Sequence, residues 1–223
     1  MFRNLIFMSN IIKIPIFPLN TILFPGMTLP LKIFENRYKT MITDCINNHS
    51  LFGICLIKEG DEVGGSAEFF GIGTIAKIDK IWEVEYGYDI KVVGQEIFKI
   101  QKIIDQEDYV YAEVELLGSL NEKPYASEDK ILELKLSVED YLNSINLFEN
   151  EWFNKINIPQ NTNSLIYFVL SRLQSDFFDL QIVLEQLSGQ SRVEKLIKLL
   201  NKETRANQLR FVDEFIGNKS ILN

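Results

Sequence analysis

The fold is decided by a stretch near the N-terminus that reads IPIFPL at residues 14–19, LFPGM at residues 23–27 and LPLKIFENRY at residues 29–38. Four prolines stand among large apolar side chains. Each proline fixes φ and removes a backbone donor, so these positions cannot all lie inside a paired sheet. The pattern predicts a short strand, a tight Phe-Pro-Gly turn, a second strand and a helix that begins near Glu35. No residue of the stretch is an obvious acid, base or nucleophile, which favours a structural role over a catalytic one.

The chain from residue 13 to residue 118 reads mainly as strands. Apolar residues at helical spacing predict one helix in it, with a stripe formed by Phe34, Tyr38, Met41, Ile42 and Cys45. Gly87 supplies a permissive turn position and predicts a long hairpin over residues 74–93. Short antiparallel strands that turn back repeatedly tend to close on themselves, because closure removes exposed edges. We therefore predict a small, partly open antiparallel β-barrel, with strands that include residues 29–33, 51–57, 75–84, 90–93, 97–104 and 109–117.

The pattern becomes helical after a linker at residues 118–127. Apolar stripes predict four helices, over residues 131–145, 165–173, 180–187 and 193–215. Gly189 stands where a C-terminal cap of the third helix belongs. Because stripes of this size need partners, the helices should form a bundle at residues 127–217. The predicted fold class is α+β, with a barrel subdomain at residues 13–118 followed by a helical bundle subdomain.

The first twelve residues are apolar, but the run is too short and too interrupted for a transmembrane helix. A signal peptide would need a longer apolar region and a small-residue cleavage site. We expect residues 1–12 to be a disordered or loosely packed extension, and Met8 is an alternative start. Cys45 and Cys55 are expected to be buried free thiols in a reducing compartment. The chain is predicted to be cytoplasmic.

Residues that could carry catalysis, a metal or a cofactor are scarce. One histidine, His49, and two cysteines are too few ligands for a His/Cys zinc site. The segment GIGTIA at residues 71–76 fits the dinucleotide fingerprint only in its letters, because a strand and not a helix is predicted to follow it. Glu83 and Glu85 share one strand face, which is typical of a solvated sheet face rather than a metal site. We expect no catalytic residue, no metal and no cofactor.

The net charge of −8 argues against nonspecific attraction to nucleic acid or to an anionic membrane. The sequence predicts no basic groove, because carboxylates are interspersed among the lysines of the strand region. Those lysines are Lys77, Lys80, Lys91, Lys99 and Lys102, of which Lys99 and Lys102 could contribute to a local patch.

The opening stretch resembles the start of the substrate-binding amino-terminal domain of the Lon family of ATP-dependent proteases. Further similar segments follow in order at residues 71–78, 88–94, 98–100 and 109–114. One departure is Ile97, where many relatives are expected to carry an arginine. The resemblance implies a PUA-like barrel that binds protein substrates. A full Lon protease continues into an ATPase module and a serine-lysine peptidase module, which do not fit in 223 residues, so we expect a free-standing domain that is not an enzyme.

Pairs of adjacent aromatic residues are the candidate binding residues. The two rings of each pair should point in different directions, so one of them can face solvent, and core packing is the alternative. An exposed group of such rings would be a site for extended apolar peptide. The candidates are Phe69, Phe70, Trp152, Phe153, Phe177 and Phe178.

The predicted function is a non-catalytic polypeptide-binding module of protein quality control, which binds unfolded or apolar protein segments as an adaptor or a holdase. Its partners would be unfolded or partly folded clients and a separate ATP-dependent protease, with no nucleic acid and no membrane. RNA binding is the alternative, because PUA-like barrels often bind RNA. A hydrolytic enzyme ranks last.

Overall fold

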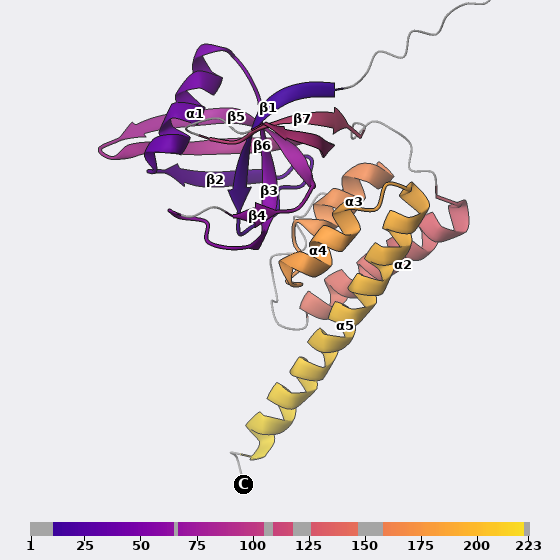
Figure 1. The fold of residues 1–223 in the computed structure, drawn as a ribbon. Coiled ribbons are helices and arrows are strands. Elements are labelled where there is room, and N and C mark those ends of the chain that lie inside the picture. The colour runs from indigo at the N-terminus through magenta and orange to yellow at the C-terminus, as the bar shows by residue number, and fades with distance from the viewer. Residues whose placement is uncertain (1–10, 65–66, 105–108, 118–125, 147–157, 221–223) are drawn as a thin grey trace, which may run out of the picture. The chain divides into compact units, whose positions relative to one another are not determined.

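The computed structural model describes residues 11–64, 67–104, 109–117, 126–146 and 158–220. The chain divides into two compact units, Met1–Leu120 and Asn121–Asn223 (Figure 1). The described part of the first unit holds a seven-stranded sheet and one helix, and that of the second holds four helices. The predicted α+β class is confirmed. Residues 1–10 of the predicted N-terminal extension lie outside the described residues. Its last two residues, Ile11 and Ile12, are already part of β1.

The sheet of the first unit closes into a ring. Its strand order is β1-β7-β6-β5-β3-β4, and β1 also pairs with β3, so five strands return to their starting point. Two further strands lie off the ring, because β2 pairs with β6 and β4 pairs with β3. The strands are β1 (Ile11–Leu19), β2 (Thr28–Ile33), β3 (Phe52–Glu59), β4 (Glu68–Phe69), β5 (Ile72–Val84), β6 (Gly87–Ile104) and β7 (Tyr111–Leu116).

Strand β1 closes the ring by changing partner half-way along its length. Residues 11–15 pair antiparallel with β7, and residues 16–19 pair parallel with β3. Pro15 is the last residue in the β7 ladder, and the amide of Ile16 then donates to the carbonyl of Val110 at 2.8 Å. A proline has no N–H to donate, so it is tolerated where a ladder ends. Two of the four prolines of the opening stretch, Pro15 and Pro18, therefore lie in the strand that closes the sheet.

One aromatic side chain packs against two glycines inside the ring of strands. Phe98 is fully buried in a cluster with Ile16, Ile75 and Val114. A Cβ atom added at Gly53 would lie 2.6 Å from Cζ of Phe98, and one added at Gly73 would lie 2.8 Å from it. The two glycines thus provide the space that the Phe98 ring occupies.

Helix α1 (Asn36–Asn47) begins directly after Glu35, as predicted. It buries Tyr38, Met41, Ile42 and Cys45 against a second core cluster beneath strands β2, β3 and β6. The fifth residue of the predicted stripe, Phe34, precedes the helix and is exposed, so its assignment to the helical stripe was wrong.

Strand β6 is one continuous strand of 18 residues, where the sequence predicted two strands with a break near Gly94. Gly94 instead receives the turn that follows β1. Its amide donates to the carbonyl of Met27, and its carbonyl accepts from the amide of Gly26, both at 2.9 Å. Because Gly94 has no side chain, the turn backbone packs directly against the strand without interrupting it.

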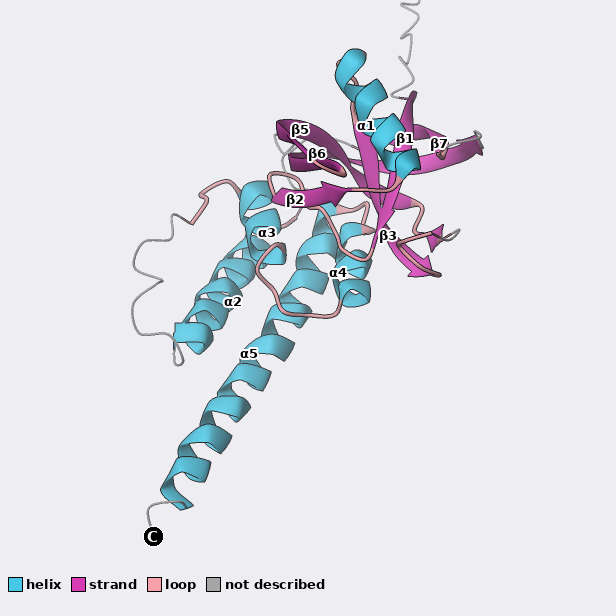
Figure 2. Cartoon of the chain, turned by 90° about the vertical axis from the view of Figure 1, so that its left-hand side faces the viewer, coloured by secondary structure: helices cyan, strands magenta, loops and turns pink. Residues whose placement is uncertain are grey.

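The four helices of the second unit are α2 (Glu128–Asn146), α3 (Thr162–Leu170), α4 (Phe177–Leu184) and α5 (Gly189–Ser220) (Figure 2). Helices α2 and α5 run parallel. The amide of Ser127 donates to Oε1 of Gln190 near their starts, and Nδ2 of Asn207 donates to Oγ of Ser144 further along, both at 3.1 Å. The predicted role of Gly189 as a C-terminal cap was wrong, because it is the first residue of α5. The residue before it is Ser188, whose carbonyl oxygen accepts a hydrogen bond from the amide of Arg192.

We predict that Gly94→Ala lowers the free energy of unfolding by about 1–3 kcal/mol, because the added methyl group overpacks the turn. A Cβ atom at Gly94 would lie 2.2 Å from the carbonyl oxygen of Phe24, which is backbone and cannot rotate away. The control is Gly71→Ala, since no atom lies within 4 Å of a Cβ atom there. Chemical denaturation followed by circular dichroism measures both variants. Equal stability of the two would contradict the role assigned to Gly94.

Candidate functional site

The predicted aromatic pairs fall in different surroundings. Phe177 and Phe178 are 44% and 48% exposed at the start of α4. Phe69 is half-buried and packs against the barrel core, and Phe70 is also half-buried. Trp152 and Phe153 lie outside the described residues. Of the described candidates, the pair on α4 is therefore the more accessible.

The exposed face of α4 carries a short apolar row. Phe178 and Ile182 lie four residues apart on one helix face, and both are exposed. The opposite face buries Leu180, Val183 and Leu184, so the helix is fixed to its unit. Asp176 caps the helix, because its side chain accepts the amide of Phe178 at 2.8 Å. We name Phe177, Phe178 and Ile182 the α4 row.

A larger apolar group, which the sequence analysis missed, lies at the end of the β5–β6 hairpin. Trp82 and Val84 from β5, Tyr86 from the turn and Phe34 from the end of β2 are all exposed, with Tyr86 at 73%. Figure 1 shows that this hairpin reaches beyond the neighbouring strand β2. We name Phe34, Trp82, Val84 and Tyr86 the hairpin patch.

The strand register brings the hairpin patch together. Val84 pairs with Gly87, and a Cβ atom built at Gly87 would lie only 3.4 Å from Cα of Phe34. Gly87 thus lies between Phe34 and Val84 and, as a glycine, places no side chain between them. Trp82 lies two residues before Val84 on β5 and therefore on the same face of the sheet. The sequence feature that could have indicated this patch is the alternation of Trp82 with Glu83, because neighbouring residues of a strand point to opposite faces.

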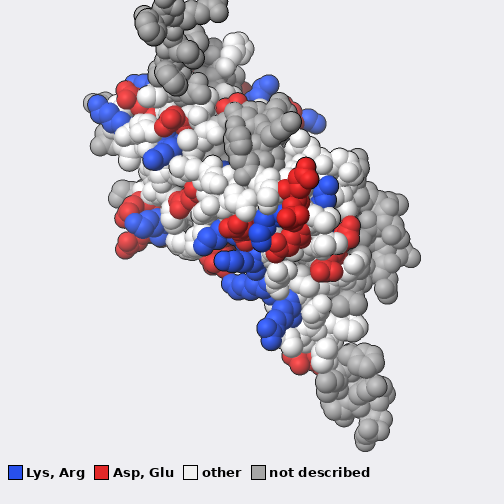
Figure 3. Space-filling model, turned by 90° about the vertical axis from the view of Figure 1, so that its right-hand side faces the viewer, with Lys and Arg blue, Asp and Glu red and all other residues white. Residues whose placement is uncertain are grey.

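Lysines continue this outer face of the β5–β6–β2 sheet beyond the hairpin patch. Trp82 pairs with Asp89, which pairs with Lys32. Lys80 pairs with Lys91 in the next row, and Lys77 pairs with Val93. Directly paired residues point to the same face, so four lysines and one aspartate share it. We name Lys32, Lys77, Lys80 and Lys91 the lysine face. On the part of the surface drawn in Figure 3, by contrast, acidic and basic side chains are intermixed.

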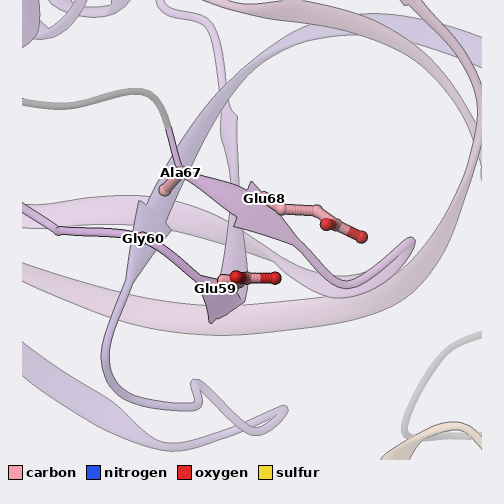
Figure 4. Close-up of a pocket in the computed structure, with 4 residues that line it drawn as sticks. All are labelled: Glu59, Gly60, Ala67 and Glu68. Atoms are coloured by element: carbon pink, nitrogen blue, oxygen red, sulfur yellow. The ribbon is translucent and has the colours of Figure 1, made fainter.

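A hollow beside β3 and β4 is lined by Glu59, Gly60, Ala67 and Glu68 (Figure 4). Glu59 pairs with Glu68 across the two strands. Lys58 contacts Oε1 of Glu68 at 2.7 Å and offsets one of the two charges. Among the described residues no group of three or more His, Cys, Asp or Glu side chains could hold a metal ion. The described lining of the hollow therefore supplies no metal site.

Burial raises the pKa of the buried thiol and phenol groups of the barrel unit, which favours their neutral forms. Both cysteines are free and buried, as predicted, and burial raises the pKa of the Cys55 thiol, which keeps it protonated. The hydroxyl of Tyr109 donates to Oδ2 of Asp44 at 2.7 Å, and burial is the main cause that raises the pKa of Tyr109. This bond ties β7 to α1. His49 is exposed, with φ of 49°, just beyond the end of α1.

We predict that Trp82→Ser changes the free energy of unfolding by no more than about 1 kcal/mol, because the ring is exposed and supports no core. Phe98→Ala is the comparison, with a predicted loss of about 3–5 kcal/mol for a fully buried ring. Urea denaturation measures both. A loss at Trp82 as large as that at Phe98 would show that the hairpin patch is a structural element and not a free surface.

The comparisons with known proteins agree on one family. The model of the ATP-dependent protease La (LON) substrate-binding domain matches residues 13–202. Lon protease 2 of Myxococcus xanthus is 24% identical over 197 residues, which are 85% of this chain and 24% of that protein. Lon protease of Magnetococcus marinus is 26% identical over 198 residues, which are 84% of this chain and 24% of that protein. The chain thus spans about a quarter of the length of these relatives.

Solved structures of two Lon N-terminal domains have the same fold. The Lon N-terminal domain protein from Xanthomonas campestris is 21% identical, with a TM-score of 0.64 over 84% of this chain and 98% of that one. The N-terminal domain of Mycobacterium avium complex Lon protease is 16% identical, with a TM-score of 0.66 over 85% and 98%. None of the described helices is long and apolar enough to cross a membrane. The resemblance seen in the sequence is confirmed, and the chain belongs to the Lon substrate-binding domain family.

Proposed function

We propose that this chain is a non-catalytic module that binds exposed apolar segments of unfolded or partly folded proteins, as an adaptor or a holdase. The observation that carries the proposal is the hairpin patch. It presents three aromatic side chains and a valine at one end of the sheet. Large apolar side chains that gather on a surface mark interaction sites. Membership of a substrate-binding family supports the same role.

The size of the patch fits weak and reversible binding. Full burial of one large apolar side chain contributes about 1.5–3 kcal/mol, and ordering of a flexible client offsets much of the sum. A module with a few such contacts releases its client readily. This suits a protein that passes clients on, and a separate ATP-dependent protease is the partner we propose for that step. We place this activity in the cytoplasm.

The proposal predicts that the double variant Phe34→Ser/Trp82→Ser weakens binding to a permanently unfolded polypeptide by about 5- to 50-fold, because it removes two of the three aromatic anchors of the patch. Fluorescence anisotropy with a labelled, reduced and alkylated polypeptide measures the affinity, in the absence of nucleotide. The native form of the same polypeptide should bind far more weakly. A second double variant, Phe177→Ser/Phe178→Ser, tests the α4 row in the same assay.

The matched control is Leu132→Ser/Leu136→Ser, which removes two exposed apolar side chains from one face of α2. Its affinity should equal that of the unmodified protein. A loss equal to that of the hairpin variant would mean that binding follows total exposed apolar area and not this patch. Absence of binding by the unmodified protein at tens of micromolar would refute the proposed function.

RNA binding is the second candidate, and the lysine face is the observation that favours it. Four lysines beside an exposed tryptophan combine phosphate neutralisation with a stacking platform. The overall charge of −8 opposes it. If this candidate holds, Lys32→Glu/Lys91→Glu abolishes the retardation of a single-stranded RNA, and the affinity of the unmodified protein falls steeply with salt. Retention of apolar polypeptide binding by that variant would separate the two functions.

A further inference from the structure

Strand β5 has a free edge along half of its length. On one side it pairs with β6 from Ile72 to Val84. On the other side it pairs with β3 only through residues 74–76, because β3 begins at Phe52, the partner of Ala76. From Lys77 to Val84, no described strand of the barrel unit pairs with this second edge. The backbone N–H and C=O groups that point outward there have no strand partner in the described part of the unit.

Side chains on the two faces of this edge define what an added strand would meet. On the outer face the edge carries Lys77 and Lys80 first and then Trp82 and Val84. The register shift between Ile78 and Lys80 keeps both lysines on that face. A strand that pairs here would place its own side chains opposite two cations at one end and opposite two apolar groups at the other.

We propose that the free edge of β5 binds a client segment by β-strand addition, and that the favoured segment is extended, with carboxylates toward one end and large apolar side chains toward the other. This inference rests on the proposed function and names its binding mode and its preferred client. Main-chain hydrogen bonds to the edge contribute affinity that does not depend on client sequence, and the alternate side chains contribute the preference. Trp82 and Val84 of the hairpin patch supply the apolar half of the site, and Lys77 and Lys80 of the lysine face supply the cationic half.

Charge complementarity favours a foreign acidic segment over a second copy of this chain. Lysines on an edge strand disfavour pairing with another edge that carries lysines, because like charges opposite each other are destabilising. The same lysines attract carboxylates. The net charge of −8 opposes this attraction as it opposes RNA binding, but screening beyond roughly 8 Å at physiological ionic strength leaves the nearby lysines dominant for a short peptide. The edge thus disfavours a second strand that sets lysines opposite its own, and it favours an acidic, apolar strand.

The test uses three synthetic peptides of about eight residues, the length of an ordinary strand. The first has aspartates in one half and alternating valine and phenylalanine in the other. The second replaces the aspartates by lysines. The third keeps the first sequence but carries N-methyl groups on alternate backbone amides, which remove strand donors without changing the side chains. Isothermal calorimetry of the full chain measures each affinity.

We expect the lysine peptide to bind about 3- to 10-fold more weakly than the aspartate peptide, because cross-strand charge pairs contribute a few tenths of a kcal/mol to 1 kcal/mol each. The N-methylated peptide should lose at least about tenfold, because its main-chain bonds to the edge are gone. Hydrogen exchange should slow at amides of residues 77–84 when the aspartate peptide is present. Lys80→Glu should abolish the preference between the first two peptides, because one cation and one anion then remain on the edge. Lys198→Glu, an equal charge change at an exposed position of α5, should leave it intact.

Each contrary result has a distinct meaning. Equal binding of the N-methylated peptide, or an unchanged preference in Lys80→Glu, overturns strand addition, even if the unfolded polypeptide still binds and the proposed function stands. If the unmodified protein binds neither the peptides nor the unfolded polypeptide, both proposals are overturned. A short single-stranded RNA that displaces the aspartate peptide and binds more tightly than it does would assign the edge to nucleic acid and also overturn this inference.

Discussion

The structure of the barrel unit depends on one strand that serves two partners. Residues 11–15 of β1 pair with β7 and residues 16–19 pair with β3, so this single strand connects β7 to β3 and completes the ring. This closure fixes where β3 can lie and leaves the later half of β5 without a neighbour on one side. The long hairpin must then extend past the ring, since β6 gains β2 as a partner there while β5 gains none in the described residues. The exposed end of the hairpin is thus a consequence of how the barrel closes.

Much of the fold could be predicted because it follows from local patterns. The period of apolar residues predicts the hairpin around Gly87 and helix α1 after Glu35, and both are found. The continuous course of β6 could not be predicted, because Gly94 resembles a strand terminator until the turn at Gly26 packs against it. The same holds for Gly189, whose role depends on whether Ser188 begins a helix. A glycine marks a special backbone position without stating which one.

The candidate site was harder to predict, because its members meet through strand register. Phe34 and Val84 are 50 residues apart in sequence and approach each other only because β2 and β5 flank the same end of β6. Adjacent aromatic pairs are visible in the sequence, but Phe69 proves to pack against the core. The lysines appear interspersed with carboxylates along the chain, whereas alternation on β2, β5 and β6 directs the lysines to one face. Sequence alone supplies the faces of each strand and not the order in which strands lie side by side.

An edge strand that stays free in solution must resist pairing with copies of itself and still accept a client. Lysines meet the first requirement with small penalties, of the order of 1 kcal/mol for each like-charge contact. Because each penalty is small, client segments are distinguished by the number of charge contacts and not by any single contact. A segment that brings two carboxylates therefore differs in affinity by only a modest factor from a segment that brings two lysines. In the binding mode we propose, such a site sorts clients by pattern rather than by sequence. That property is what a module facing many different unfolded chains requires, and it follows from a short edge, two lysines and two apolar side chains on one face of β5.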